Sequence, residues 1–284
     1  MKVIWVLENI KDDEGIYGKL NTLMLIASIQ LWKKNHPTDN CVLYCDKLTL
    51  RYLERLSIGH LWDSIEEYTH TRNIDRTVFW AASKVAVLSQ QTEPVILMDN
   101  DTLVYKPITH LLDKDTTYVC NLEKGRGYYP TGYDEIIKKL SYRPRWKTDS
   151  LCVAFLHLPD PEFTKLYANM SLDMMEELTA LGAPNPQYLI FAEQLFLRHL
   201  LEVKQKPLKG LIKTYWDCQP WEWAEDHEDG LWTYEESQQY FKHYGPLKSW
   251  IIRNEGDQNY DRVIKELENC VNMPNLDLSH LTVM

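Results

Sequence analysis

Short apolar runs alternate with longer amphipathic segments along the first hundred residues. Uncharged apolar runs bounded by polar residues predict buried strands, and we expect such strands at 2–7, 41–45 and 94–98. Segments with apolar residues at helical spacing separate these runs, and we expect helices at 17–37, 48–56 and 77–90. This alternation predicts an α/β fold in which the strands run parallel.

The second half of the chain is less regular. We expect a strand at 151–158 and helices at 162–181 and 186–203, followed by an irregular stretch at 215–234. That stretch contains four tryptophans among acidic residues, which favours either an acceptor-binding loop or a long surface loop anchored by its aromatic rings. Because no repeat or linker is evident, we expect a single domain over 1–284. Its nucleotide-binding half would span 1–105 and its acceptor-binding half 106–284.

Two aspartates follow the apolar run that ends at Met98, in "VILMDNDTLV". Ligands of α/β sheets bind beyond the carboxyl ends of the strands, where Asp99 and Asp101 are expected. Alternate residues of an extended segment share a side, so the two carboxylates could bind one hard cation such as Mg²⁺ or Mn²⁺. The alternative is a pair of aspartates that cap a turn. "DKD" at 113–115 has the same spacing, but its context predicts a solvated turn.

Charge and composition limit the partners. The chain has 284 residues, 44% of them hydrophobic, and 31 basic against 41 acidic residues give a net charge of −10. A folded protein is expected, and binding to a nucleic-acid backbone is disfavoured. The N-terminus does not resemble a secretion signal, and the apolar run at 20–32 is too short to span a bilayer. Six cysteines without metal-binding spacing are expected to be reduced thiols, which suits a cytoplasmic location.

The segment "HYGPLKSW" (243–250) combines several residues suited to binding a diphosphate. His243 could supply a nitrogen ligand to a metal, Gly245 could allow backbone N–H groups to approach a phosphate, and Lys248 could neutralise its charge. Each residue alone also has an ordinary structural explanation, so the combination carries the interpretation.

Together these segments resemble the glycogenin-like, family 8 retaining glycosyltransferases, which have the GT-A fold. In that family a Thr/Ser-Lys on a helix precedes an apolar strand that ends in D-x-D. "ASKVAVLSQQTEPVILMDNDTLV" is similar, with Lys84, Asp99, Asp101 and Thr102 in matching places. "HYGPLKSW" resembles the family's C-terminal H-[FY]-x-G-x-x-K-P-W, with one residue fewer before the glycine and Ser249 in place of proline.

Three looser matches lie elsewhere in the chain. "SLCVAFLHL" (150–158) resembles the strand that lines the family's sugar pocket, although Ser150 and Cys152 replace its Asn and Gly. "EQLFL" resembles the start of the family's D-Q-x-x-L helix and places Glu193 and Gln194 there. Tyr17 stands roughly where the family stacks the nucleotide base.

The resemblance implies a mixed sheet of Rossmann-like GT-A type and a metal-dependent transfer of a sugar from a nucleotide sugar, a UDP-sugar, to a hydroxyl acceptor such as a saccharide. It implies that Mn²⁺ or Mg²⁺ is bound by Asp99, Asp101 and His243. The donor would be bound by Tyr17, Lys84, Asn100, Gly245 and Lys248. Catalytic roles would fall to Lys84, Gln194 and either Glu193 or Asp149, and the family retains anomeric configuration.

Other functions remain open at this point. A sugar-phosphate nucleotidyltransferase is disfavoured, because no glycine-rich phosphate loop follows the first strand. A non-catalytic nucleotide-sugar-binding module would explain the departures at Ser150 and Cys152. A glycosyltransferase acting on a modified nucleobase would use the locally basic segment 124–147, which otherwise reads as a loop over the active site.

Overall fold

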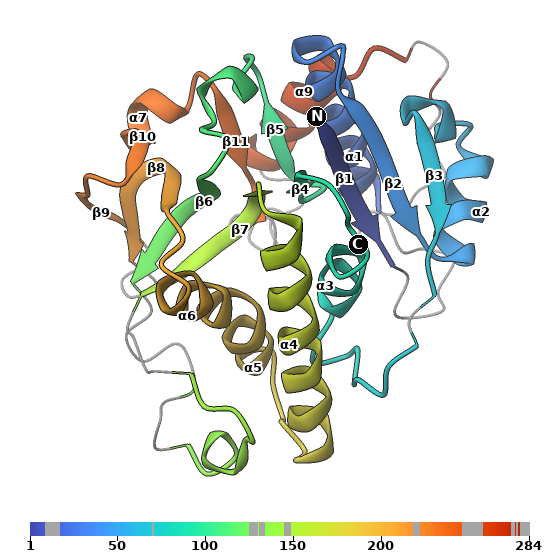
Figure 1. Ribbon diagram of the computed structural model, residues 1–284. Helices are drawn as coiled ribbons and strands as arrows, with labels where there is room; N and C mark the ends of the chain where they lie inside the picture. The colour runs from blue at the N-terminus through green and yellow to red at the C-terminus, as the bar shows by residue number, and fades with distance from the viewer. Residues whose placement is uncertain are drawn as a thin grey trace. The chain divides into compact units, whose positions relative to one another are not determined.

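The protein is described by a computed structural model that covers residues 1–8, 18–69, 71–124, 130, 134–144, 149–217, 222–245, 258–273, 276 and 278. Figure 1 shows the helices and strands of the chain with their labels. The chain divides into two compact units. Unit 1 comprises Met1–Tyr68, Leu97–Leu111 and Gln238–Met284, and unit 2 comprises Thr69–Ile96 and Leu112–Ser237.

Parallel strands form the first part of unit 1. Strand β1 (Lys2–Leu7) pairs with β2 (Asn40–Cys45), which pairs with β3 (Ser64–Glu67). Helices α1 (Lys19–Asn35) and α2 (Lys47–Arg55) and the 3-10 turn Gly59–Leu61 connect them. The expected strands and helices of this part are therefore confirmed, and the sequence pattern missed only β3, which has no fully buried residue.

Burial explains these elements. Residues 3–7 of β1 are all buried, as expected for a central parallel strand, and α1 is buried on most of its surface. Helix α2 begins where the Asp46 carboxylate accepts a hydrogen bond from the Thr49 N–H at 2.8 Å. Such an N-cap satisfies one of the free N–H groups of the first turn.

A short antiparallel ribbon completes unit 1. Strand β4 (Val95–Met98), which enters unit 1 at Leu97, leads into the Asp99–Asp101 turn. The turn is followed by β5 (Thr102–Val104) and a 3-10 turn, Thr109–Leu111. Strand β5 pairs with β11 (Phe241–His243), and helix α9 (Gln258–Cys270) follows later in the chain. Helix α1 packs against both β5 and α9.

Unit 2 contains strands in both orientations. Strand β6 (Thr117–Lys124) pairs antiparallel with β7 (Asp149–Leu158) and parallel with β8 (Leu208–Asp217). Strand β8 also pairs parallel with β10 (Gly230–Trp232) and antiparallel with β9 (Glu222–Asp226). The expected irregular stretch at 215–234 is thus wrong for its described residues, because Trp216 and Trp223 face each other across two paired strands.

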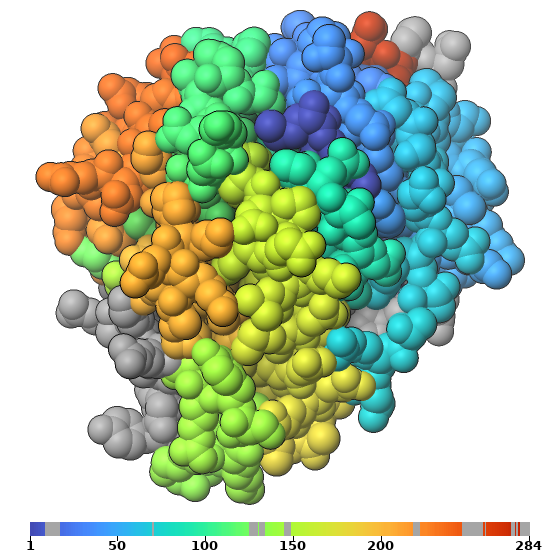
Figure 2. All heavy atoms as spheres, in the orientation of Figure 1, coloured from blue at the N-terminus to red at the C-terminus, as the bar shows by residue number. Residues whose placement is uncertain are grey.

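Helices flank the strands of unit 2. They are α3 (Ala82–Leu88), the 3-10 turn Ile137–Lys139, α4 (Pro161–Ala180), α5 (Gln187–Ile190), α6 (Phe196–Val203) and α7 (Tyr234–Ser237). Helix α4 packs against α3, and its residues Lys165, Leu166 and Asp173 are exposed. Part of this helix reaches the molecular surface, where Figure 2 shows it in yellow-green. Asp160 caps its first turn by accepting from the N–H groups of Glu162 and Phe163.

Two expected helices differ in detail. Helix α3 begins at Ala82 instead of residue 77, because Asp75 accepts hydrogen bonds from Thr77 and holds the preceding residues in turns. The helix expected at 186–203 is interrupted by a π-helical turn, Phe191–Leu195, between α5 and α6. Within the described residues, no helix has the length and apolarity needed to cross a membrane.

Candidate metal centre

The Asp99–Asp101 turn brings two carboxylates out of a buried strand. All four residues of β4 are buried, and the Thr102 N–H donates to the Asp99 carbonyl at 3.2 Å, which closes the turn before β5. Asp99 is partly exposed, whereas the side chain of Asp101 is only 8% exposed. A buried carboxylate needs a compensating charge or hydrogen bonds, so its surroundings matter for what it binds.

The pairing of β5 with β11 brings His243 to this turn. In the antiparallel register His243 lies opposite Thr102, directly after Asp101. The Tyr244 N–H donates to the Asp101 carbonyl at 3.0 Å and extends the pairing into the turn itself. The imidazole and the carboxylates, far apart in sequence, therefore meet because two three-residue strands pair.

The donor atoms of Asp99, Asp101 and His243 all lie within 4.8 Å of one another. The Asp101 Oδ1 atom is 3.6 Å from His243 Nε2, which is longer than a hydrogen bond. Ligands of one divalent ion, at about 2.1 Å from it, lie roughly 3–4 Å apart, so this spacing suits shared coordination. Two carboxylates and an imidazole fit Mn²⁺ or Mg²⁺, with further positions left for other oxygen ligands.

Helix α1 fixes the position of β5. The buried Ser28 hydroxyl donates to the Thr102 carbonyl at 2.8 Å and accepts from the Trp5 indole N–H at 3.1 Å. Farther along, the Asn35 amide donates to the Val104 carbonyl at 2.9 Å. These contacts connect the strand after the aspartates to β1 and α1 in the core of unit 1.

Gly245 lies against the imidazole of His243. A Cβ atom at this position would be 2.4 Å from Nε2 and 2.5 Å from Cε1 of His243, closer than such atoms come in proteins. Glycine is therefore needed here by the proposed metal ligand. The sequence pattern predicts that Gly245 lets backbone N–H groups approach a phosphate, and its closeness to the imidazole is an additional reason for a glycine here.

Of the remaining predicted donor-binding residues in unit 1, the structure describes only Asn100. Asn100 is partly exposed in the turn between the two aspartates. Tyr17 and Lys248 lie outside the described residues. The second D-x-D copy behaves as expected, because Asp113, Lys114 and Asp115 are exposed in a turn before β6.

Lys84 and Asp149 belong to unit 2. Lys84 lies on α3 with its Nζ atom 5.6 Å from the ring centroid of Trp80, a side chain that is 47% exposed. Asp149 is the first residue of β7 and lies opposite Lys124 of β6, which in turn lies opposite Asp217 of β8. The Lys124 ammonium group forms an ion pair with Glu225 of β9 and lies 4.6 Å from the ring centroid of Tyr215.

Glu193 and Gln194 lie on the π-helical turn Phe191–Leu195. Such turns widen a helix and are frequent at functional sites. Two hydroxyls from α4 hydrogen-bond to carbonyls of the turn: Ser171 to Ala192 at 2.6 Å and Tyr167 to Glu193 at 3.1 Å. Burial and the nearby Glu193 raise the pKa of Tyr167 well above its usual value, so its hydroxyl remains a donor. Glu193 and Gln194 were predicted only from the family resemblance. The sequence did not predict a role for Ser171 or Tyr167.

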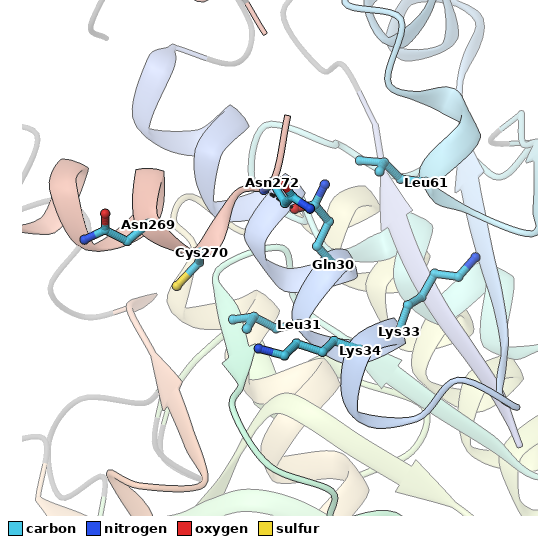
Figure 3. Close-up of a pocket in the computed structure, with 8 residues that line it drawn as sticks. All are labelled: Gln30, Leu31, Lys33, Lys34, Leu61, Asn269, Cys270 and Asn272. Atoms are coloured by element: carbon cyan, nitrogen blue, oxygen red, sulfur yellow. Dashed lines mark hydrogen bonds between the residues drawn. The ribbon is translucent and has the colours of Figure 1, made fainter. Parts of the chain in front are cut away.

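A separate pocket of about 690 Å³ lies in unit 1 (Figure 3). It is formed by Gln30, Leu31, Lys33 and Lys34 of α1 with Leu61, Asn269, Cys270 and Asn272. Its two lysines lie in the last turn of α1, where positive charge stabilises the helix dipole. None of the predicted site residues lines this pocket, so the candidate metal centre is a different place in the unit.

Comparison with known sequences gives a family without an assigned activity. The model of a family of unknown function, DUF6734, matches residues 43–253. No curated protein matches the sequence.

Comparison with solved structures identifies the fold. An active-site mutant of LgtC matches with a TM-score of 0.53 and 13% identity over 97% of this chain and 98% of that one. The galactosyltransferase LgtC in complex with donor and acceptor sugar analogs matches with a TM-score of 0.51, the same identity and the same coverage. The glycosyltransferase GlyE of Streptococcus pneumoniae matches with a TM-score of 0.37 and 11% identity, over 74% of this chain and 45% of that one. The LgtC matches confirm the predicted α/β fold of GT-A type.

Proposed function

Because the chain belongs to DUF6734, a family of unknown function, we propose its activity from the site: metal-dependent transfer of a sugar from a nucleotide sugar to a hydroxyl acceptor. The observation that carries this proposal is the β5–β11 pairing, which gathers two carboxylates and an imidazole around one point. The fold shared with LgtC, whose structure was determined with donor and acceptor sugar analogs, supports the substrate class. The proposed donor is a UDP-sugar and the proposed acceptor a saccharide.

Asp99, Asp101 and His243 would hold Mn²⁺ or Mg²⁺ through two carboxylates and Nε2. When bound, such an ion supplies Lewis-acid stabilisation for negative charge on the diphosphate leaving group. The buried Asp101 is suited to this task, because removing water from a carboxylate strengthens its interaction with a cation.

The other predicted residues have proposed roles around this centre. Lys248 and Lys84 would bind the diphosphate or the sugar through their ammonium groups, and Tyr17 would stack on the base. Asn100, next to both carboxylates, would hydrogen-bond to the donor. Gly245 leaves room for the imidazole and keeps side-chain bulk away from the phosphates.

Glu193, Gln194 and Asp149 are proposed to orient the sugar and the acceptor hydroxyl. We propose that residues 1–105 bind the nucleotide and residues 106–284 the acceptor. Transfer with retention requires no dedicated protein base if the leaving diphosphate takes the acceptor proton. NMR of the product anomer tests retention directly.

The aspartate pair is tested by replacing Asp101 with asparagine. Asp101→Asn keeps the shape but removes the charge, so we expect UDP-sugar turnover to fall roughly 100-fold and Mn²⁺-dependent UDP binding to weaken. Turnover is measured by UDP release from a panel of UDP-sugars with Mn²⁺, and binding by calorimetry.

Asp115→Asn is the matched control, because Asp115 belongs to the exposed second D-x-D copy. It should leave turnover and binding within about twofold. Unchanged Mn²⁺–UDP affinity in Asp101→Asn would remove the aspartate from the site. Binding without any turnover in the wild-type protein would identify a nucleotide-sugar-binding module instead of an enzyme.

A further inference from the structure

The strands that carry the candidate metal ligands form a ribbon of their own in unit 1. Strands β5 and β11 have three residues each, and among the described strands they pair only with each other. An isolated two-stranded ribbon is marginally stable in water, so its geometry depends on contacts from outside. Ser28 and Asn35 of α1 supply such contacts to β5.

Glu266 of α9 contacts both strands of the ribbon through one carboxylate. The Lys242 ammonium group of β11 donates to Oε1 at 3.0 Å and to Oε2 at 2.9 Å. The hydroxyl of Tyr105, which directly follows β5, donates to Oε1 at 3.0 Å. The Tyr105 N–H also donates to the Tyr240 carbonyl at 2.8 Å, so this residue continues the ribbon.

This contact lies on the side of the ribbon away from the imidazole. Neighbouring residues of a strand point to opposite faces, so Lys242 and His243 project in opposite directions. Glu266 therefore holds the back of the ribbon, while the other face of β11 carries the proposed metal ligand. A change in the position of Lys242 would shift the backbone of its neighbour His243.

The surroundings of the Glu266 carboxylate favour its charged form. Its side chain is 35% exposed, and that of Lys242 is 28% exposed. Burial alone would raise the pKa of Glu266, but hydrogen bonds from Lys242 and Tyr105 outweigh it and lower the pKa below its usual value. The Lys242 ammonium group also lies 4.5 Å from the ring centroid of Tyr244, which limits the places it can occupy.

We propose that Glu266 is a positioning residue for the candidate metal centre. Through Lys242 and Tyr105 it fixes β11 against β5, and so fixes His243 against Asp101. This inference rests on the proposed function, because it assigns Glu266 to the same metal site.

The test measures Mn²⁺ affinity in the folded protein. In Glu266→Gln the side chain keeps its size and can still accept from Tyr105, but it loses its charge pairing with Lys242. We expect Mn²⁺ binding, followed by electron paramagnetic resonance of the free ion, to weaken about 10-fold, which is typical when a group supporting a metal ligand is lost. The His243 imidazole resonance in NMR should shift as well.

Glu268→Gln is the matched control, because Glu268 lies on the same helix and pairs with Lys19 at 2.9 Å with a side chain that is 49% exposed. It should bind Mn²⁺ within about twofold of wild type. All measurements are made well below the unfolding temperature of each variant, so that a loss of stability alone does not change the affinity.

The outcomes separate this proposal from the metal site itself. If Asp101→Asn abolishes Mn²⁺ binding while folded Glu266→Gln binds as wild type and keeps its His243 resonance, the positioning role is wrong and the metal site stands. If the wild-type protein binds no Mn²⁺, both proposals fail. Should Glu266→Gln not fold, Tyr105→Phe removes a single hydrogen bond, and we expect roughly a threefold loss of affinity; unchanged affinity there would overturn the proposal.

Discussion

At the scale of single residues, the candidate metal centre depends on how closely Gly245 and His243 approach each other. The closeness of the imidazole leaves no room for a side chain at residue 245. A substitution there acts directly on a proposed metal ligand, without changing any charge. This makes Gly245 a sensitive probe of the imidazole's position.

Gly245→Ala should force the His243 ring to move, because the added carbon would lie 2.4 Å from Nε2. We expect Mn²⁺ affinity and sugar transfer to fall about 10-fold, whereas the unfolding temperature should change only slightly. Gly59→Ala is the control, since its added carbon would meet only the flexible end of Ile65, at 3.3 Å. Equal Mn²⁺ affinity in both variants would contradict a role for His243 as ligand.

Residue patterns could propose Asp99, Asp101 and His243 as metal ligands, but not the residues that hold them in place. The two aspartates follow a recognisable buried strand, and His243 opens a motif that resembles a known family. Ser28 and Glu266 act through hydrogen bonds across the fold, and nothing in their local sequence distinguishes them from ordinary helix residues. Asn100 is a similar case, since its proposed role rests only on its position between the two aspartates.

At the scale of elements, the hydrophobic pattern of the sequence predicted the strands and helices that have a strong local signal. Strands β1, β2 and β4 are continuous apolar runs, and α1 and α4 have long helical periodicity, so local sequence was sufficient. Strands β5 and β11, "TLV" and "FKH", are too short to show any period, and only their partner makes them strands. The π-helical turn at 191–195 was missed because its residues have ordinary helical composition.

The π-helical turn gives a prediction at this scale. In Ser171→Ala the buried Ala192 carbonyl loses its hydroxyl donor, which should cost about 1–3 kcal/mol of unfolding free energy. Because the turn carries the proposed catalytic residues Glu193 and Gln194, turnover should fall about 10-fold. Urea unfolding and UDP release measure the two effects.

Mn²⁺ affinity is the internal control for Ser171→Ala. Ser171 and the turn belong to unit 2, whereas all three proposed metal ligands belong to unit 1. Because the Ser171 hydroxyl donates to the Ala192 carbonyl and not to a proposed metal ligand, the affinity should stay within about twofold of wild type. Full turnover in a folded, destabilised variant would mean that the turn has only a structural role.

At the scale of the whole molecule, buried histidines link stability to pH. Burial lowers the pKa of His36, His157 and the half-buried His227 below the usual value of 6.5. His36 is held neutral by geometry as well, because its Nε2 accepts the Ile108 N–H at 2.9 Å. These histidines therefore bind protons less readily in the folded protein than in the unfolded chain.

The sign of the pH effect follows from this difference. Below about pH 6.5 the unfolded chain binds more protons, so the free energy of unfolding should fall as the pH decreases, by up to about 1.4 kcal/mol per pH unit for each histidine. Urea unfolding at pH 7.5, 6.5 and 5.5 measures the slope. His157→Gln should reduce this slope, and His60→Gln, at an exposed position, is the control for the substitution itself. Equal slopes in both variants would show that burial of His157 does not drive the effect.

The division of the chain into interleaved units has a consequence for the order of synthesis. All of unit 2 precedes residue 238, whereas unit 1 takes its last segment from Gln238 onward. His243 and Glu266 both belong to that last segment. A growing chain therefore carries both aspartates and every residue of unit 2 before it carries the imidazole. The candidate metal centre can assemble only among the final steps of folding.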